Sequence, residues 1–156
     1  MLKDIQWKCK FAVILLLLIA GSVYAQTINA ELQQINSSYA LQYLGKASAL
    51  YKDGNYTEAL AYAEKGMTFD GSFADFYYIK AQCLRQLNKP RIQSLEAAEY
   101  ANTAGLQCRI FTPDDLILLL ARLYTETKQY RDVLSLLEKV SLPSADGDLY
   151  RAAALY

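Results

Sequence analysis

Histidine is absent from this chain of 156 residues, and cysteine and proline are scarce, with three of each. The lack of histidine removes the commonest general base and the commonest metal ligand. Three prolines and seven glycines leave room for long uninterrupted helices. Neither sign of charge predominates, because 16 lysines and arginines balance 16 acidic residues. This balance argues against nucleic-acid binding, which usually needs a basic stripe.

The N-terminal segment 1–25 has the order of a secretory signal peptide. Three lysines near the start are followed by the unbroken apolar run Phe11–Ala20 and by the small and β-branched residues that a signal peptidase favours near Val23–Ala25. The run is ten residues long, whereas a membrane-spanning helix needs roughly 20. We therefore expect an exported protein, periplasmic or extracellular. The alternative is an anchor at the inner membrane through residues 11–25.

Removal of the segment 1–25 would leave a net charge of −2, since three lysines and one aspartate would be lost. A mildly acidic domain is not attracted to membranes or phosphates, so membrane contact is expected only if the N-terminal segment is retained. Residues 26–39 are predicted to form a leader or linker, and residues 40–156 a domain of helical repeats.

A helix hairpin is predicted at about residues 40–73. Leu44, Ala47 and Tyr51 lie on one helical face, as spacings of three and four require. Asp53–Asn55 then breaks the helix, because Gly54 can adopt the left-handed conformation that ends a helix at little cost. The second helix is expected to begin at Tyr56 and to end near Asp70-Gly71.

The hairpin pattern recurs with a period of roughly 34 residues. Ala81 follows Ala47, and Tyr77 follows Tyr43, at this same interval. The second helices carry small or apolar residues at matching spacings: Ala59, Ala63 and Gly66, then Ala97, Ala101 and Ala104, then Val133, Leu137 and Val140. Further units are therefore predicted at about 74–110 and 113–146, with a partial fourth at 147–156. A period of this length with helix–turn–helix content is typical of tetratricopeptide repeats.

Specific segments resemble that family. They are the turn Tyr51–Leu60, the helix end Glu64–Gly66, and the segments Lys128–Leu134 and Leu137–Val140 in the third unit. The resemblance covers about residues 40–156. It implies an all-α fold, an α-solenoid of antiparallel helix hairpins wound as a right-handed superhelix.

The second unit departs from the pattern. The interval from Ala81 to Ala97 is four residues longer than the interval from Ala47 to Ala59. Four residues are therefore expected to be added around Asn88–Arg91, and two more before the third unit. The addition is either a longer surface turn or a loop that contacts a partner.

The resemblance also implies a concave groove lined by the first helix of each unit. Aromatic and arginine side chains there would favour binding, since both are enriched in interface hot spots. The alternative is that the tyrosines pack between helices and the arginines are solvated. The predicted groove residues are Leu44, Ser48, Tyr51, Tyr78, Gln82, Arg85, Leu118, Arg122 and Thr125.

The chemistry of this set points to a protein or peptide partner. Family members that grip a C-terminal carboxylate have lysine and asparagine where this chain has Leu44 and Ser48, so that mode is not expected. An amphipathic helix or an extended segment fits better. The terminal helix Leu149–Tyr156 would lack a second helix, so we also expect self-association through it, or further repeats in a longer protein.

No catalytic, metal or cofactor site is predicted, and the chain is not expected to be an enzyme. Cys83 and Cys108 should lie roughly 16 Å apart along a hairpin, too far for a disulfide. Asp114 and Asp115 follow Thr112-Pro113 and suit a helix start better than an acid–base pair. The other acidic pairs, Glu96 with Glu99 and Asp146 with Asp148, lack further ligands.

The predicted function is that of a protein–protein interaction scaffold or adaptor of the cell envelope. The alternative is an interaction module of a larger exported or membrane-anchored enzyme or sensor.

Overall fold

A computed structural model describes the backbone of residues 2–138 and 145–155, and the side chains of 21–138 and 147–155. Two compact units divide the chain, Met1–Ser38 and Tyr39–Tyr156. Several residues used in the sequence argument lie outside this description: the side chains before Gly21 and that of Asp146, and all of Val140 and Tyr156.

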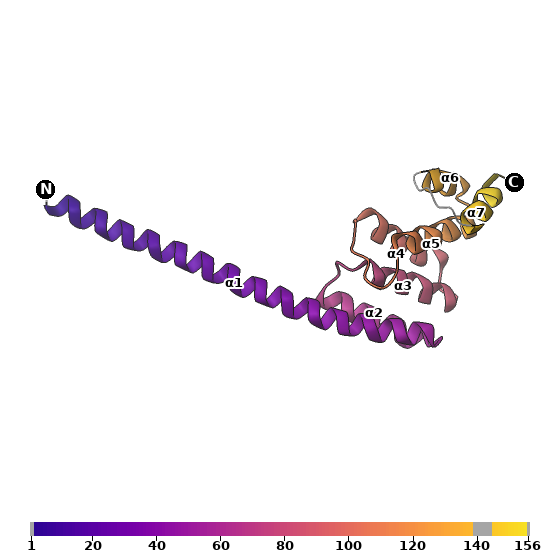
Figure 1. Ribbon diagram of the computed structural model, residues 1–156, viewed down its shortest axis with the longest axis horizontal. Coiled ribbons are helices and arrows are strands. Elements are labelled where there is room, and N and C mark those ends of the chain that lie inside the picture. The colour runs from indigo at the N-terminus through magenta and orange to yellow at the C-terminus, as the bar shows by residue number, and fades with distance from the viewer. Residues whose placement is uncertain (1, 139–144, 156) are drawn as a thin grey trace. The chain divides into compact units, whose positions relative to one another are not determined.

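Regular structure in the described residues consists of seven α-helices and a single isolated bridge (Figure 1). The prediction of an all-α fold is therefore confirmed. The helices are α1 Leu2–Lys52, α2 Tyr56–Phe69, α3 Ala74–Gln86, α4 Arg91–Thr103, α5 Pro113–Glu126, α6 Tyr130–Glu138 and α7 Ala145–Leu155.

The first unit is the N-terminal part of α1. Residues 26–38, expected to be a leader, are helical and continuous with the segments before and after them. Every residue from Gly21 to Asn36 is exposed. Within the part of the chain that the structure describes, no helix combines the length and the hydropathy needed to cross a membrane.

The second unit begins with hairpin one, made of residues 39–52 of α1 and helix α2. The helices break where the sequence predicted, with Gly54 at a φ of +79°. Asn55 caps α2, since its side-chain oxygen accepts a hydrogen bond from the Glu58 backbone N–H. Small residues allow the two helices to approach closely, and Ala47, Ala59 and Ala63 are fully buried between them.

Hairpin two, made of α3 and α4, differs from the prediction. Its turn, Leu87–Pro90, has four residues, only one more than the turns of the other two hairpins. The buried positions of α4 that repeat the spacing of Ala59, Ala63 and Gly66 are Ser94, Ala98 and Ala101. Of the three positions that the sequence predicted for this helix, Ala97 and Ala101 are buried, but Ala104 is exposed beyond the helix end. The expected loop of four added residues is therefore wrong.

Most of the added residues lie between hairpins two and three. The connection from α2 to α3 has four residues, whereas residues 104–112, between α4 and α5, number nine. We call residues 104–112 the crossing loop. Its Gln107 pairs with Phe73 in the isolated parallel bridge, with N–H···O distances of 2.8 and 3.0 Å to Ala74 and Ser72.

Hairpin three is made of α5 and α6, and α7 packs against both of its helices. Leu116, Leu119, Leu120 and Leu123 of α5 share a core with α3 and α4. On another face of α5, Ala121 packs with Val133 and Leu137 of α6 and with Tyr150 of α7. Helix α5 thus connects the core of hairpin two to the last helices of the chain.

Candidate partner-binding surface

The nine predicted groove residues lie on α1, α3 and α5, but three of them are not accessible. Leu44 and Ser48 on α1 and Gln82 on α3 are buried, with at most 8% of each residue exposed. A partner therefore has little access to these three side chains in the folded chain. Spacing along a helix cannot separate a groove-lining position from a neighbouring position that faces the adjacent helix.

Tyr51 and Tyr78 form an aromatic cluster with a residue that the sequence did not point to. The ring of Phe111, in the crossing loop, stacks on Tyr78 at a centroid distance of 4.2 Å and meets Tyr51 edge-on at 6.4 Å. Burial, and then the neighbouring Tyr78, raises the pKa of Tyr51 to about 12. Burial also raises the pKa of Tyr78, although the hydrogen bond from Gln82 opposes that rise. The two tyrosines are therefore half-buried, and each contacts Phe111 with its ring.

Asp75 holds Phe111 in this position. Its carboxylate is 1% exposed and accepts hydrogen bonds from the backbone N–H groups of Arg109, Ile110 and Phe111 at 2.7 to 2.8 Å. Hydrogen bonds to an ionised acceptor are stronger than neutral ones, and three of them offset the cost of burying a carboxylate. A lone aspartate in the first turn of a helix resembles any helix start, so its role was not visible in the sequence.

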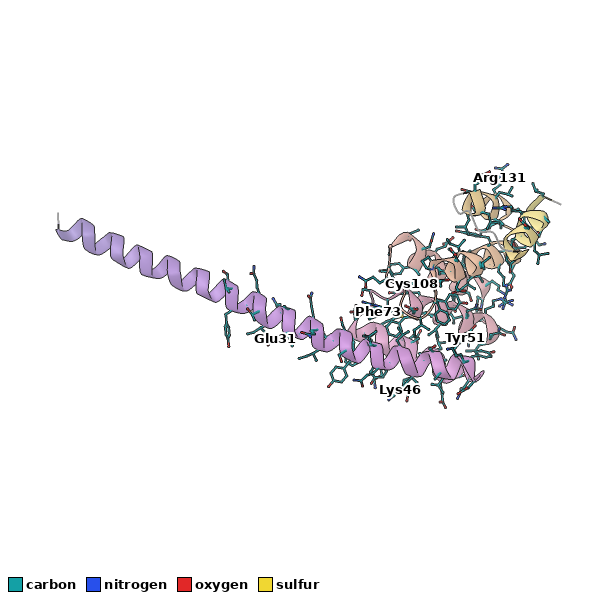
Figure 2. All side chains as sticks on the ribbon, viewed as in Figure 1. Glu31, Lys46, Tyr51, Phe73, Cys108 and Arg131 are labelled. Atoms are coloured by element: carbon teal, nitrogen blue, oxygen red, sulfur yellow. The ribbon has the colours of Figure 1, made fainter. Side chains whose placement is uncertain are left out.

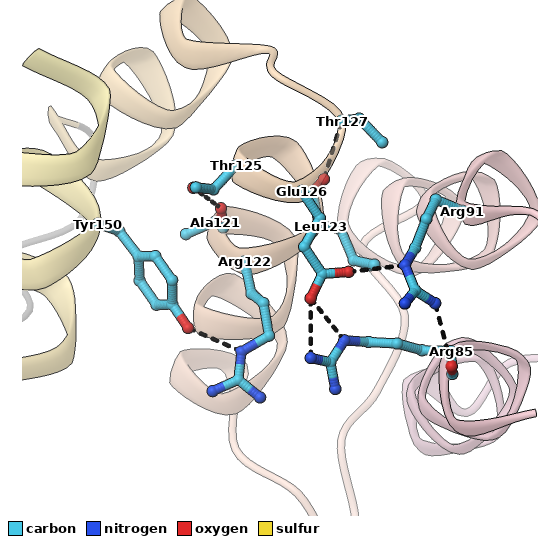
Figure 3. A network of polar contacts seen from close by, with 9 residues as sticks. All are labelled: Arg85, Arg91, Ala121, Arg122, Leu123, Thr125, Glu126, Thr127 and Tyr150. Atoms are coloured by element: carbon cyan, nitrogen blue, oxygen red, sulfur yellow. Dashed lines mark hydrogen bonds and ion pairs between the residues drawn. The ribbon is translucent and has the colours of Figure 1, made fainter. Parts of the chain in front are cut away.

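An ion-pair network joins α3, α4 and α5 at the predicted residue Arg85 (Figure 3). The Nε and Nη2 atoms of Arg85 both lie 2.8 Å from Oε1 of Glu126, and Nε of Arg91 lies 3.0 Å from its Oε2. Arg91 also donates to the backbone carbonyl of Arg85 at 3.0 Å. The Glu126 carboxylate therefore forms ion pairs with two guanidinium groups, and these three side chains together carry a net positive charge.

Arg122 lies on the next predicted first helix, in the same view as this network (Figure 3). Its Nε donates to the Tyr150 hydroxyl of α7 at 2.8 Å, while the residue as a whole remains exposed. Thr125 donates to the Ala121 carbonyl one turn earlier. Leu118 is half-buried beside the α6–α7 core. Of the nine predicted residues, Arg122 is the most accessible.

A second concave region was not predicted. Residues of α2, α3 and α4 line a cleft of about 360 Å³, where the rings of Tyr77 and Tyr100 lie 4.9 Å apart. Lys80 and Glu64 form an ion pair of 2.9 Å at its edge. In the sequence, this cleft could have been found only from Tyr77 and Tyr100, which lie on adjacent helices. Both tyrosines resembled ordinary surface residues.

Three of the acidic residues considered as chemical groups have structural contacts. Asp115 and Thr112 form a reciprocal capping box at the start of α5, as predicted. Glu99 accepts a hydrogen bond from Tyr124 at 2.8 Å, and Asp148 pairs with Arg151 at 3.1 Å. No group of three potential metal ligands occurs among the described side chains.

Both described cysteines are free thiols. Burial raises the pKa of Cys83 to about 12, and burial together with Asp75 and Asp115 raises the pKa of Cys108. The neutral thiol therefore predominates at both positions near neutral pH.

Comparisons with known proteins give one informative similarity. No protein-family profile matches the chain. An uncharacterized protein of Treponema pallidum (strain Nichols) is 33% identical over 112 residues. The similarity covers 72% of this chain but 14% of that protein, so the chain spans a small part of its relative's length.

Proposed function

We propose that this chain is a protein-binding module, built as a right-handed solenoid of the tetratricopeptide type. The observation that carries the proposal is the repetition of one hairpin register. Buried small or apolar residues oppose each other as Ala47 and Ala59 in hairpin one and as Ala121 and Val133 in hairpin three. Stacked hairpins of this kind present extended surfaces on which partners bind.

The accessible part of the first helices defines where the partner would bind. Arg85, Arg122 and the Phe111 cluster combine guanidinium groups with aromatic rings, the side chains most often found in interface hot spots. Such a surface suits an amphipathic helix or an extended segment of another protein. We call these residues the arginine–aromatic surface.

Capture of a partner from cell envelopes tests this assignment. Tagged protein would be cross-linked and purified alongside Arg122→Glu and a matched control, Arg131→Glu, which reverses the same charge at an exposed site on α6. We expect the parent and the control to capture one shared partner and Arg122→Glu to lose it. Circular dichroism establishes that both variants keep their helix content. Equal capture by all three proteins would contradict the arginine–aromatic surface.

The cell envelope is the proposed location, on the basis of the charged start and the apolar run before Val23. The intact mass of protein recovered from whole cells tests it. Loss of residues 1–25 indicates export with cleavage. A mass that still includes them, with the protein in the membrane fraction, indicates the anchored alternative.

A second candidate is an interaction module within a larger protein. It is favoured by the finding that the similar segment makes up 14% of the Treponema pallidum protein. An antibody against residues 40–156 would distinguish the two candidates on a denaturing gel of whole cells. A band far above 17.6 kDa supports the larger protein, and a band at or just below this mass supports a separate adaptor.

A further inference from the structure

An apolar stripe runs along α1 in the first unit. Tyr24, Ile28, Leu32 and Ile35 are each between 42% and 72% exposed, and they recur at intervals of four, four and three residues (Figure 2 shows this segment near Glu31). These intervals place them on one side of the helix. An isolated helix gains little stability in water, so an exposed stripe of large apolar residues favours a partner that covers it.

The spacing of the stripe fits a coiled-coil seam. Ala25, Ile28, Leu32 and Ile35 alternate by three and four residues, which is the pattern of positions a and d in a coiled coil. Leu32 then stands at a, and Ile28 and Ile35 stand at d. A stripe with this period packs best against a helix with the same period, and another copy of the chain supplies one in register.

Charge indicates how the copies align. Between Gly21 and Ser38 the sequence has one charged residue, Glu31, at position g. In a parallel arrangement, position g faces position e of the next heptad, here the neutral Asn36. An antiparallel pair centred on the stripe would bring the two Glu31 carboxylates toward each other. The parallel arrangement therefore keeps the Glu31 carboxylates farther apart than this antiparallel pair does.

We propose that α1 assembles copies of this chain into a parallel helical bundle of three or four chains through Ile28, Leu32 and Ile35. Leucine at a with isoleucine at d favours more than two strands. The helix does not have to nucleate alone, because residues 39–52 of the same α1 are held in hairpin one. The bundle is independent of the arginine–aromatic surface, and either assignment can fail without the other.

Sedimentation equilibrium of the full chain in mild detergent tests the bundle. Leu32→Asp places a charge at the centre of the stripe, and Ala30→Asp places the same charge at position f, on the opposite side. We expect three or four chains for the parent and for Ala30→Asp, and a single chain for Leu32→Asp. Circular dichroism checks that helix content is retained.

Three outcomes would overturn the bundle. One is a parent protein that remains a monomer or a dimer at every protein concentration tested, up to roughly 100 times a micromolar Kd. Another is a parent mass that Leu32→Asp leaves unchanged, which would place the contact elsewhere, for example at α7. The third is a single chain that floats with phospholipid vesicles through Leu32, which would assign the stripe to a lipid surface.

Disulfide trapping tests the alignment separately. In a background with Cys9→Ser, Cys83→Ala and Cys108→Ser, a mild oxidant should link Ile35→Cys chains to each other but not Ala30→Cys chains. An antiparallel pair would bring position 35 near position 28. Cross-linking only between Ile35→Cys and Ile28→Cys chains would therefore overturn the parallel alignment.

Discussion

At the residue scale, two carboxylates arrange the candidate surface, that of Asp75, which is buried, and that of Glu126, which is partly exposed. Asp75 holds the backbone of residues 109–111, and Glu126 joins Arg85 to Arg91 across three helices. Each is a single side chain whose partners lie on another element. Removal of Asp75 would leave three backbone N–H groups without their acceptor, which is costly where little water reaches.

Asp75→Ala should therefore lower the free energy of unfolding by about 3 kcal/mol, because it removes three charge-assisted hydrogen bonds. Urea denaturation followed by circular dichroism measures the loss. Asp114→Ala, which removes an exposed carboxylate in the first turn of α5, should cost less than about 1 kcal/mol. Equal losses for the two variants would show that Asp75 does not stabilise the crossing loop.

Stability should also fall at alkaline pH because of Cys83. Its pKa rises from 9.0 to about 12 on folding, so the neutral thiol is the folded form and ionisation favours the unfolded chain. The stabilising effect is complete below pH 9 and is lost as the pH rises toward 12. Tyr51 and Tyr78 add to the decline at higher pH, since burial raises their pKa values from 10.0.

Urea midpoints at pH 8 and pH 10 give the test. Between pH 8 and pH 10, we expect the free energy of unfolding of Cys83→Ala to fall by about 1 kcal/mol less than that of the parent. The packing cost of the substitution is the same at both pH values and cancels in this comparison. A decline of the same size in both proteins would show that the Cys83 thiol ionises in the folded state as it does in the unfolded chain.

At the scale of helices, the register between paired helices depends on where small residues permit contact. Gly66 of α2 lies against Phe76 of α3, and a Cβ atom built at Gly66 would lie 2.3 Å from the Phe76 ring. The equivalent position in hairpin two is Ala101, which is 2% exposed. The aromatic ring of α3 is therefore the reason that hairpin one requires glycine at this position.

Gly66→Ala should destabilise the protein by about 1–3 kcal/mol, even though alanine is the better helix former, because the buried Phe76 ring cannot move aside freely. Gly45→Ala is a matched control in α1, with no atom within 4 Å of the added methyl group. This control should gain up to about 1 kcal/mol from helix propensity. Thermal unfolding measures both changes, and a stabilised Gly66→Ala protein would contradict the packing described for α2 and α3.

At the scale of the molecule, the second unit is coupled mainly between neighbouring elements. Helix α5 shares one core with hairpin two and another with α6 and α7. One polar link from α5 to α7 is the hydrogen bond between Arg122 and Tyr150. Where elements are coupled mainly to their neighbours, the terminal elements open most readily, and a local change weakens its neighbours more than distant elements.

Tyr150→Phe should therefore loosen α7 alone. Loss of one hydrogen bond to a charged donor should cost about 1 to 2 kcal/mol and speed amide hydrogen exchange in α7 about tenfold or more, with little change in α3 and α4. Tyr130→Phe, at an exposed tyrosine of α6, is the control and should leave exchange unchanged. Faster exchange throughout the second unit would show that the unit unfolds as one cooperative body.

Local features of the sequence determined several of the helix ends. Gly54 with Asn55, and Thr112 with Pro113 and Asp115, act within a few residues, because helix termination and capping need no distant partner. Apolar spacing along each helix likewise identified most of the core. Spacing did not reveal that α4 repeats the hairpin register at Ser94, since a serine does not look like a core residue.

Tertiary structure alone decided the candidate surface. Phe111 meets Tyr78 only because Asp75, 36 residues earlier, binds the crossing loop, and Arg85 is paired by a glutamate 41 residues away. Leu44, Ser48 and Gln82 were predicted to be accessible but are buried in the folded chain. Short-range contacts specify where a helix begins and ends, but which of its faces remains open depends on contacts between residues that are far apart in the chain.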